Sequence, residues 1–169
     1  MIYYHETPKR QNKLSAVLSL CCAVAGLLLL TFARHLPYTS LIQMLSLIFW
    51  VVAVYMAARS VIGYTYRLQR DENDGKDELA VVQIKGKRTV TVCRLLLSDL
   101  REWDAVSSAN EKEIKEKYRA DRIHNYCVDL APSRSVYLLF EENGARIVLR
   151  LQAGEEFLSR LKALTSPTL

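Results

Sequence analysis

Two long apolar segments near the start of this 169-residue chain decide its fold: LSAVLSLCCAVAGLLLLTFA at residues 14–33 and LIQMLSLIFWVVAVYMAARSVI at residues 41–62. Sixteen of the first twenty residues are apolar and none is charged, whereas the second segment has eighteen apolar residues in twenty-two and one charge, Arg59. A helix rises about 1.5 Å per residue, so about 20 residues cross a hydrocarbon core of about 30 Å. The segments therefore predict two transmembrane helices.

Three alternatives fit the two segments less well. Buried core helices of this length normally carry a polar stripe, which both segments lack. A cleaved signal peptide is suggested by the preceding basic residues and by Ala-Val-Ala at residues 23–25, but the apolar run continues through residues 27–30 and a second segment follows. A lipoprotein signal that ends at Cys21 is the third alternative. The residue before Cys21 is Leu20, whereas lipoprotein signals have a small residue at that position.

Basic residues on both sides of the hairpin predict its orientation. They are Lys9, Arg10 and Lys13 before the first segment, and Arg59 near the end of the second segment with Arg67 and Arg70 beyond it. The connection 34–40 holds only Arg34 and His35. Basic flanks favour the cytoplasmic side. We therefore expect a multi-pass protein of the cell membrane with both termini cytoplasmic: an N-terminal tail at 1–13, a transmembrane hairpin at 14–62 and a cytoplasmic domain at 63–169.

Small residues recur at helical spacing inside the two segments. They are Ser15, Ser19, Ala23, Cys22, Gly26, Ala53 and Ala57. Small side chains let membrane helices approach closely, either within one hairpin or between two copies of the chain. Neither segment holds an acidic residue, and the amide Gln43 is near the outer end, so an ion-coupled transporter is not predicted.

From Gly63 onward the pattern changes to the period of two that is typical of strands. Strand-like runs are expected at 64–69, 79–84, 89–97 and 123–130, and at 136–142 and 145–151 around Asn143-Gly144, a strong hairpin signal. The stretch 98–106 is ambiguous between strand and short helix. In total, about seven strands are expected.

Two helices are expected within this β-rich part. The stretch 107–120 has a capping-box pattern (Ser108 and Glu111), favourably ordered charge pairs (Glu111/Lys115 and Glu113/Lys117) and a narrow apolar stripe of Ile114 and Tyr118. This helix is either a solvated surface helix or a docking face for a partner. A second helix from about Gly154 to Leu164 has an apolar face of Phe157, Leu158, Leu161 and Leu164.

Seven strands closed by a C-terminal amphipathic helix are the organisation of pleckstrin-homology-like (PH-like) domains. The segments VVQIKGKRTVTVCRLLLSDL (81–100), HNYCVDL (124–130) and RIVLRLQAGEEFLSRL (146–161) resemble small clostridial membrane proteins in which two spans precede such a domain. The resemblance implies an α+β membrane protein: a transmembrane helical hairpin, then a PH-like antiparallel sandwich or open barrel with a C-terminal capping helix. It brings no catalytic motif and no activity with it.

The candidate chemical groups do not form a catalytic constellation. Cys93 and Cys127 are expected as core thiols, and a strand would point His124 and Cys127 to opposite faces. The cysteines and histidines lack metal-ligand spacing, and phosphate-binding glycine loops and G-x-S-x-G elbows are absent. We therefore expect a protein that is not an enzyme and has neither a cofactor nor a metal.

A basic turn is the most suggestive surface feature. Lys85, Lys87 and Arg88 cluster on one hairpin, and Arg94 follows along the strand. This cluster is either a solvated turn or a site for anionic lipid headgroups or an acidic partner. Residues 63–169 contain 18 basic and 17 acidic residues, which disfavours nucleic-acid binding.

The leading hypothesis is therefore a membrane-anchored PH-like domain that binds a protein or assembles with itself at the cytoplasmic face. An anionic-lipid-sensing or envelope-stress module that uses the basic turn is the alternative. A membrane-bound thiol enzyme is a third hypothesis, which would need Cys93 or Cys127 to be exposed and reactive.

Overall fold

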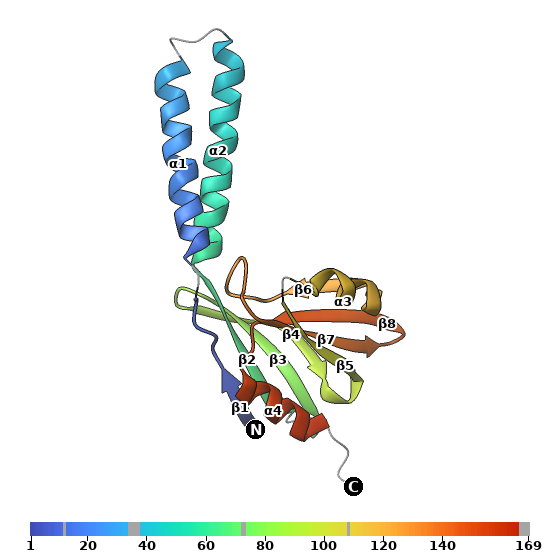
Figure 1. The fold of residues 1–169 in the computed structure, drawn as a ribbon. Coiled ribbons are helices and arrows are strands. Elements are labelled where there is room, and N and C mark those ends of the chain that lie inside the picture. Colours follow the sequence, from blue (N-terminus) through green and yellow to red (C-terminus); the bar gives the residue numbers. More distant parts are fainter. Residues whose placement is uncertain (12, 34–37, 72–73, 108, 166–169) are drawn as a thin grey trace. The chain divides into compact units, whose positions relative to one another are not determined.

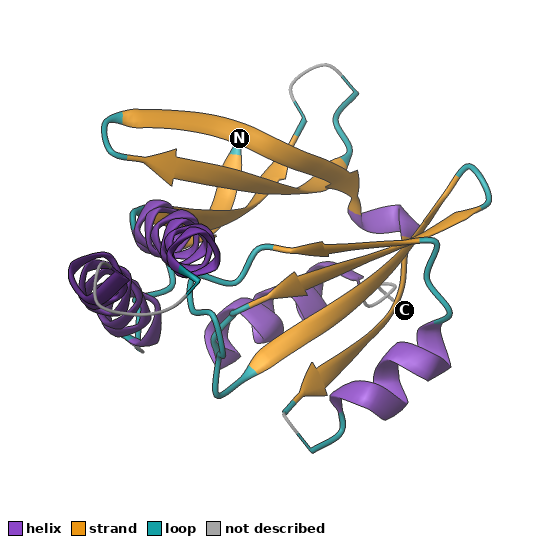
Figure 2. Ribbon diagram, turned by 90° about the horizontal axis from the view of Figure 1, so that it is seen from above, coloured by secondary structure: helices purple, strands orange, loops and turns teal. Residues whose placement is uncertain are grey.

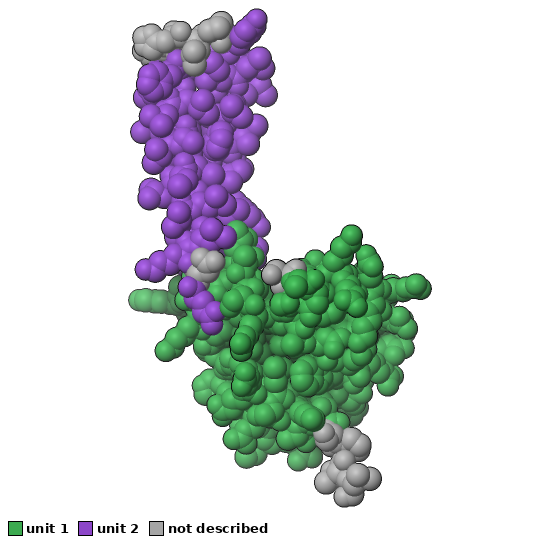
Figure 3. Space-filling model, in the orientation of Figure 1, with its two compact units in different colours: residues 1–10, 63–169 green, residues 11–62 purple. Residues whose placement is uncertain are grey.

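The structure is a computed structural model that describes residues 1–11, 13–33, 38–71, 74–107 and 109–165. It is an α+β protein with two long apolar helices near the N-terminus, followed by β-sheets and a C-terminal helix (Figure 1). The chain forms two compact units, coloured separately in Figure 3. One unit is residues 11–62, the helical hairpin, and the other combines residues 1–10 with 63–169, the β-domain.

The hairpin consists of α1 (Leu14–Phe32) and α2 (Thr39–Ser60), both long and apolar enough to cross a membrane. Ten buried or half-buried positions alternate by four and three residues: 15, 19, 22, 26 and 29 on α1, and 42, 46, 49, 53 and 56 on α2. Residues 23, 25 and 52 lie beside this row and are also half-buried. This spacing is typical of two helices that cross at a small angle with interlocking side chains. The hairpin therefore has one continuous internal seam.

The β-domain contains two four-stranded sheets (Figures 1 and 2). The first has the order β1-β2-β3-β4 and comprises β1 (Ile2–Glu6), β2 (Ile62–Arg70), β3 (Asp77–Lys85) and β4 (Arg88–Leu96). The second has the order β5-β7-β8-β6 and comprises β5 (Leu100–Val106), β6 (Arg122–Asn125), β7 (Ser135–Glu142) and β8 (Ala145–Leu151). A short 3₁₀ turn, η2 (Leu97–Asp99), precedes β5 and accounts for the ambiguous pattern at 98–106.

Strand β1 differs from the expected N-terminal tail. It pairs with β2 in antiparallel fashion, from Ile2 opposite Gln69 to Glu6 opposite Tyr66. The helical hairpin is therefore inserted between two strands that are neighbours in one sheet. Seven strands follow α1, as expected from the sequence, and β1 is an eighth in the described part of the chain.

The main core lies between the two sheets, where α4 (Glu155–Thr165) also packs. Phe157 and Leu161 of α4 are fully buried, and Leu158 and Leu164 pack at the edge of the core, which confirms the predicted apolar face. The predicted β7–β8 hairpin is also confirmed. Its turn residues Asn143 and Gly144 both have positive φ, 52° and 80°, as a two-residue turn requires.

Helix α3 (Glu111–Tyr118) packs against the second sheet through Ile114 and Tyr118, which contact a cluster of Val106, Tyr137 and Val148. The Glu111–Lys115 ion pair forms as expected, at 2.7 Å. Lys117, however, pairs with Asp104 and Glu102 of β5, where the sequence suggested Glu113. The predicted capping box depends on residue 108, which is outside the described residues; the residue that precedes the helix is Asn110.

Strand β6 is shorter than the predicted strand 123–130 and pairs with β8 in parallel, whereas an antiparallel sandwich was expected. The chain leaves the sheet after Asn125 because the backbone N–H of Cys127 donates to Asn125 Oδ1 at 3.0 Å. Such a local turn competes with strand pairing.

Candidate functional site

The turn between β3 and β4 carries the exposed basic cluster. Lys85 pairs with Arg88 across the end of the strands, and Gly86 has a φ of +61°, a conformation that glycine adopts without strain. Every residue from 85 to 92 is exposed. Side chains of a strand alternate between its two faces, so exposure at every position means that both faces of this part of β4 are open to the surroundings. We call residues 85–92 the basic arm.

Charge is segregated onto this part of the β-domain. Residues 79–98 contain four basic and no acidic side chains, whereas the rest of 63–169 contains 14 basic and 17 acidic residues. Other cations of the domain are paired with carboxylates, among them Arg101, Lys115, Lys117 and Arg150. Lys85, Lys87 and Arg88 make no ion pair with the acidic residues that the structure describes. The positive potential of the arm is therefore not neutralised by those residues.

Arg94 does not belong to this cluster. It lies six residues beyond Arg88 on β4, about 20 Å away at about 3.3 Å per residue. Its Nη1 is 4.0 Å from Oε1 of Glu78 on β3, a buried carboxylate whose side chain is 6% exposed. The structure thus separates Arg94 from the other three predicted site residues.

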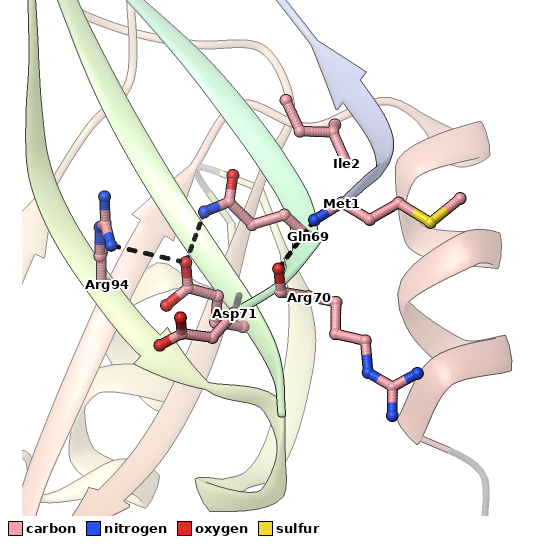
Figure 4. Close-up of a pocket in the computed structure, with 7 residues that line it drawn as sticks. Met1, Ile2, Gln69, Arg70, Asp71 and Arg94 are labelled. Carbon is pink, nitrogen blue, oxygen red and sulfur yellow. Dashed lines mark hydrogen bonds and ion pairs between the residues drawn. The ribbon is translucent and has the colours of Figure 1, made fainter. Parts of the chain in front are cut away.

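Arg94 lines a polar pocket of about 410 Å³ at the other end of the same sheet (Figure 4). Its lining residues are Met1, Ile2, Gln69, Arg70, Asp71, Glu78 and Arg94. Gln69 Nε2 donates to Glu78 Oε1, and the N-terminal amino group donates to the Arg70 carbonyl oxygen at 3.0 Å. Sequence reasoning missed this pocket because its residues come from all four strands of the first sheet and share no motif.

The predicted partner face of α3 is not available to a partner. Ile114 and Tyr118 are 7% and 2% exposed, because they cover the outer face of the second sheet. The Tyr118 hydroxyl also donates to Asp104 Oδ2 at 2.9 Å. The apolar stripe is therefore part of the core.

The thiols and the histidine are placed where nucleophilic chemistry is disfavoured. Cys127 is buried, and burial raises the pKa of the half-buried Cys93 thiol, which reduces its thiolate fraction. His124 is exposed on β6, where its ring stacks on Tyr126 with centroids 6.1 Å apart. Cys93 and Cys127 do not form a disulfide with each other.

Most of the small residues of the hairpin lie on its internal seam. Ser15, Gly26 and Ala53 are buried, and Ser19, Cys22 and Ala23 are half-buried. The Ser19 hydroxyl donates to the Ala53 carbonyl oxygen at 2.9 Å, and the hydroxyl of Ser46 donates to the Gly26 carbonyl oxygen at 2.8 Å. Ala57 is exposed, so it is not part of the seam.

Within the residues that the structure describes, no group of three or more His, Cys, Asp or Glu side chains could hold a metal ion. Comparisons with protein-family models, with curated proteins and with solved structures found no match to this chain. The candidate site with the clearest chemistry is therefore the basic arm, and it is assigned from its own geometry.

Proposed function

We propose that this protein is an integral membrane protein whose helical hairpin anchors a non-enzymatic PH-like β-domain at the cytoplasmic face of the membrane. There the domain binds a protein or assembles with itself. The observation that carries the proposal is the distribution of side chains on the hairpin. The buried positions within its two helices hold small side chains, whereas large apolar side chains such as Leu20, Phe32 and Leu41 face outward and are exposed. Such a distribution of side chains is suited to a lipid environment.

The pairing of β1 with β2 supports a hairpin that crosses the membrane twice. These strands precede α1 and follow α2, and their registered pairing requires both ends of the hairpin to be on the same side of a membrane. The basic residues on the two flanks favour the cytoplasmic side. The β-domain would then be cytoplasmic as a whole, including its N-terminal strand.

The arrangement of the β-domain supports the PH-like assignment. A four-stranded antiparallel sheet is followed by a second sheet and a C-terminal helix that packs into the core between them. The parallel strand β6 is an addition to that plan. The carboxylates of Glu111, Asp104 and Asp129 bond to other elements of the fold, so these groups hold the domain together.

Membrane insertion and topology can be tested on the full chain. We expect the protein to stay with the membrane after alkaline carbonate extraction. We also expect protease to digest the β-domain in inverted vesicles and to leave it intact in whole cells. Release by carbonate, or digestion from outside, would contradict the proposal.

Binding is tested separately, by crosslinking in native membranes followed by purification in mild detergent. We expect one defined species, either a homo-oligomer or a complex with a specific protein. A protein that is monomeric at every crosslinker concentration and yields no reproducible partner would contradict the binding role without affecting the anchoring.

A further inference from the structure

We propose that the basic arm docks on the anionic surface of the bilayer that holds the hairpin. The inference rests on the proposed membrane anchoring and adds a partner to it: the negatively charged lipid headgroups at the cytoplasmic face. Three features of the β-domain support it, namely the place of the arm in the sheet, its charge and its exposed apolar side chains.

The place of the arm follows from the strand that enters the sheet from α2. Strand β2 begins at Ile62, two residues after the last residue of α2, Ser60. Gly63 lies directly against Ile84 of β3, because a Cβ added at Gly63 would be 3.8 Å from the Ile84 Cβ. The arm begins at the next residue, Lys85. It therefore starts at the end of the sheet where the chain arrives from the hairpin.

The charge of the arm suits an anionic surface. Lys85, Lys87 and Arg88 are exposed and make no ion pair with the described acidic residues, and no acidic residue occurs between Glu78 and Asp99. Each basic residue close to an anionic membrane increases the population of the docked state about fivefold. Three such residues together correspond to a factor on the order of 100.

The arm also presents apolar side chains beside the cations. Val90 and Val92 of β4 are 59% and 38% exposed, and Thr89 and Thr91 alternate with them. β4 is at the end of the strand order, so one of its edges has no neighbouring strand among the described residues. Cations next to exposed valines match the boundary between headgroups and acyl chains, where apolar groups are partly buried.

An acidic peptide that adds a strand to β4 is the main competing occupant. Such a peptide would use the same cations and the free edge of the strand. The adjacency of Gly63 and Ile84 favours the bilayer, because it ties the arm to the segment that leaves the membrane anchor, whereas peptide binding has no need of that position. The experiment below separates the two.

The test is hydrogen–deuterium exchange of the full chain in nanodiscs. One set contains phosphatidylcholine alone and the other contains about one third phosphatidylglycerol. We expect the backbone amides of 85–92 to exchange more slowly, by at least about tenfold, in the anionic discs, since charge alone predicts a factor on the order of 100. The triple variant Lys85→Glu, Lys87→Glu, Arg88→Glu should lose this difference.

A matched control has the same change in net charge elsewhere. Lys112→Glu, Arg122→Glu and Lys162→Glu replace three exposed basic residues outside the arm, and this variant should keep the lipid-dependent protection. A second variant, Val90→Thr with Val92→Thr, keeps the shape and charge of the arm and should retain only part of the protection.

Equal exchange of the arm in both lipids would overturn the inference. So would equal loss of protection in the control variant, or protection that depends on an added polyglutamate peptide and not on phosphatidylglycerol. These results would leave the anchoring intact, provided that the protein assembles into the discs. Failure to assemble into discs of either composition would instead contradict the proposed function itself.

Discussion

The helical hairpin and the β-domain bury opposite kinds of side chain. The hairpin encloses Ser15, Gly26, Ser46 and Ala53 and exposes most of its leucines and valines. The β-domain encloses Tyr66, Phe140, Phe157 and many leucines and exposes most of its charges. In water, large apolar side chains are buried in the protein interior. In lipid they can face outward, and small side chains inside let the helix backbones pack closely. This contrast is the one expected if, as proposed, the hairpin lies in lipid and the β-domain lies in water.

The two kinds of interior should fail in opposite ways when side-chain size is changed. A core of large side chains is damaged by loss of volume, and a seam of small side chains is damaged by gain of volume.

The largest expected effect is that of Phe157→Ala in α4. Phe157 is fully buried, and its ring contacts those of Tyr66 and Tyr4 at centroid distances of 5.9 and 6.2 Å. Removal of a buried phenylalanine ring costs about 3–5 kcal/mol of stability. Chemical denaturation of the full chain in mild detergent, followed by the β-sheet signal in circular dichroism, measures the loss. Val90→Ala, at an exposed position, should change stability by less than about 0.5 kcal/mol. Similar losses for both variants would contradict the assigned core.

Gly26→Leu is the corresponding change in the hairpin. A Cβ at Gly26 would already lie 3.1 Å from Cδ1 and Nε1 of Trp50 on α2, so a leucine must displace the Trp50 indole or push the helices apart. Overpacking of this kind costs about 1–3 kcal/mol. Helix separation should appear as a change in Trp50 fluorescence and as a lower thermal midpoint of the α-helical signal.

Ala57→Leu is the control for Gly26→Leu, because Ala57 is exposed and a larger side chain there meets no helix of the same hairpin. We expect an unchanged thermal midpoint for this variant. If Ala57→Leu were as damaging as Gly26→Leu, the exposed face of α2 would have to be an interface with a second copy of the chain.

Sequence periodicity predicted much of this fold, since period and turn chemistry are local properties. The β7–β8 hairpin follows from Asn143-Gly144 between alternating strands, and α4 follows from its spaced apolar residues. Strand β1 was missed because five residues, IYYHE, carry too little alternation to outweigh the basic residues that follow. Its partner, β2, is also more than fifty residues away, and such pairing leaves no local pattern.

The candidate site was predictable only in part, for the same reason. The turn that brings Lys85, Lys87 and Arg88 together is local, so the cluster was visible in the sequence. Arg94 is separated from this cluster because β4 is long and extended. The pairing of Arg94 with Glu78 depends on the register of β3 against β4. The burial of Ile114 and Tyr118 depends on where α3 packs, which amphipathicity alone does not determine.

Glu111→Gln tests the polar contacts that hold α3 to the second sheet. Both oxygens of Glu111 accept from Arg150, at 2.9 and 3.1 Å, and Oε1 also accepts from Tyr137. Loss of a charged partner in such a contact costs about 1.5 kcal/mol. Glu113→Gln on the exposed side of α3 is the control and should have little effect.

The pH dependence of Glu111→Gln has a defined sign. Hydrogen bonding to Lys115, helped by the charge of Arg150, holds the pKa of Glu111 below its usual range. Its stabilisation is therefore present above the pKa of the unfolded chain and is lost as the pH falls through the folded value. The difference between the wild type and Glu111→Gln should shrink in acid, and a difference that grew in acid would contradict the assignment.

Glu6→Gln is expected to have the smallest effect on stability. Its pH dependence is opposite in sign to that of Glu111→Gln. Glu6 Oε1 accepts from the backbone N–H of Gly154 at 2.9 Å, just before α4, while its buried Oε2 has no partner among the described residues. Burial chiefly, with a contribution from the charge of Glu156, raises the pKa of Glu6 above its ordinary value. Ionisation is thus less favourable in the folded protein than in the unfolded chain, so stability falls as the pH rises from the unfolded-chain pKa of Glu6 to its folded pKa.

Glutamine keeps an oxygen that accepts from Gly154 and removes the charge. The two proteins should therefore be about equally stable below the pKa of the unfolded chain. Glu6→Gln should become the more stable as the pH rises through the folded pKa of Glu6, after which the difference should stay constant. Denaturation series of both proteins between acid and neutral pH measure this difference. A wild type that gained stability over Glu6→Gln as the pH rose would mean that the Glu6 carboxylate is compensated in the folded state. The contact between Glu6 of β1 and Gly154 would then be a favourable interaction of the charge, and not a hydrogen bond that holds against the cost of burial.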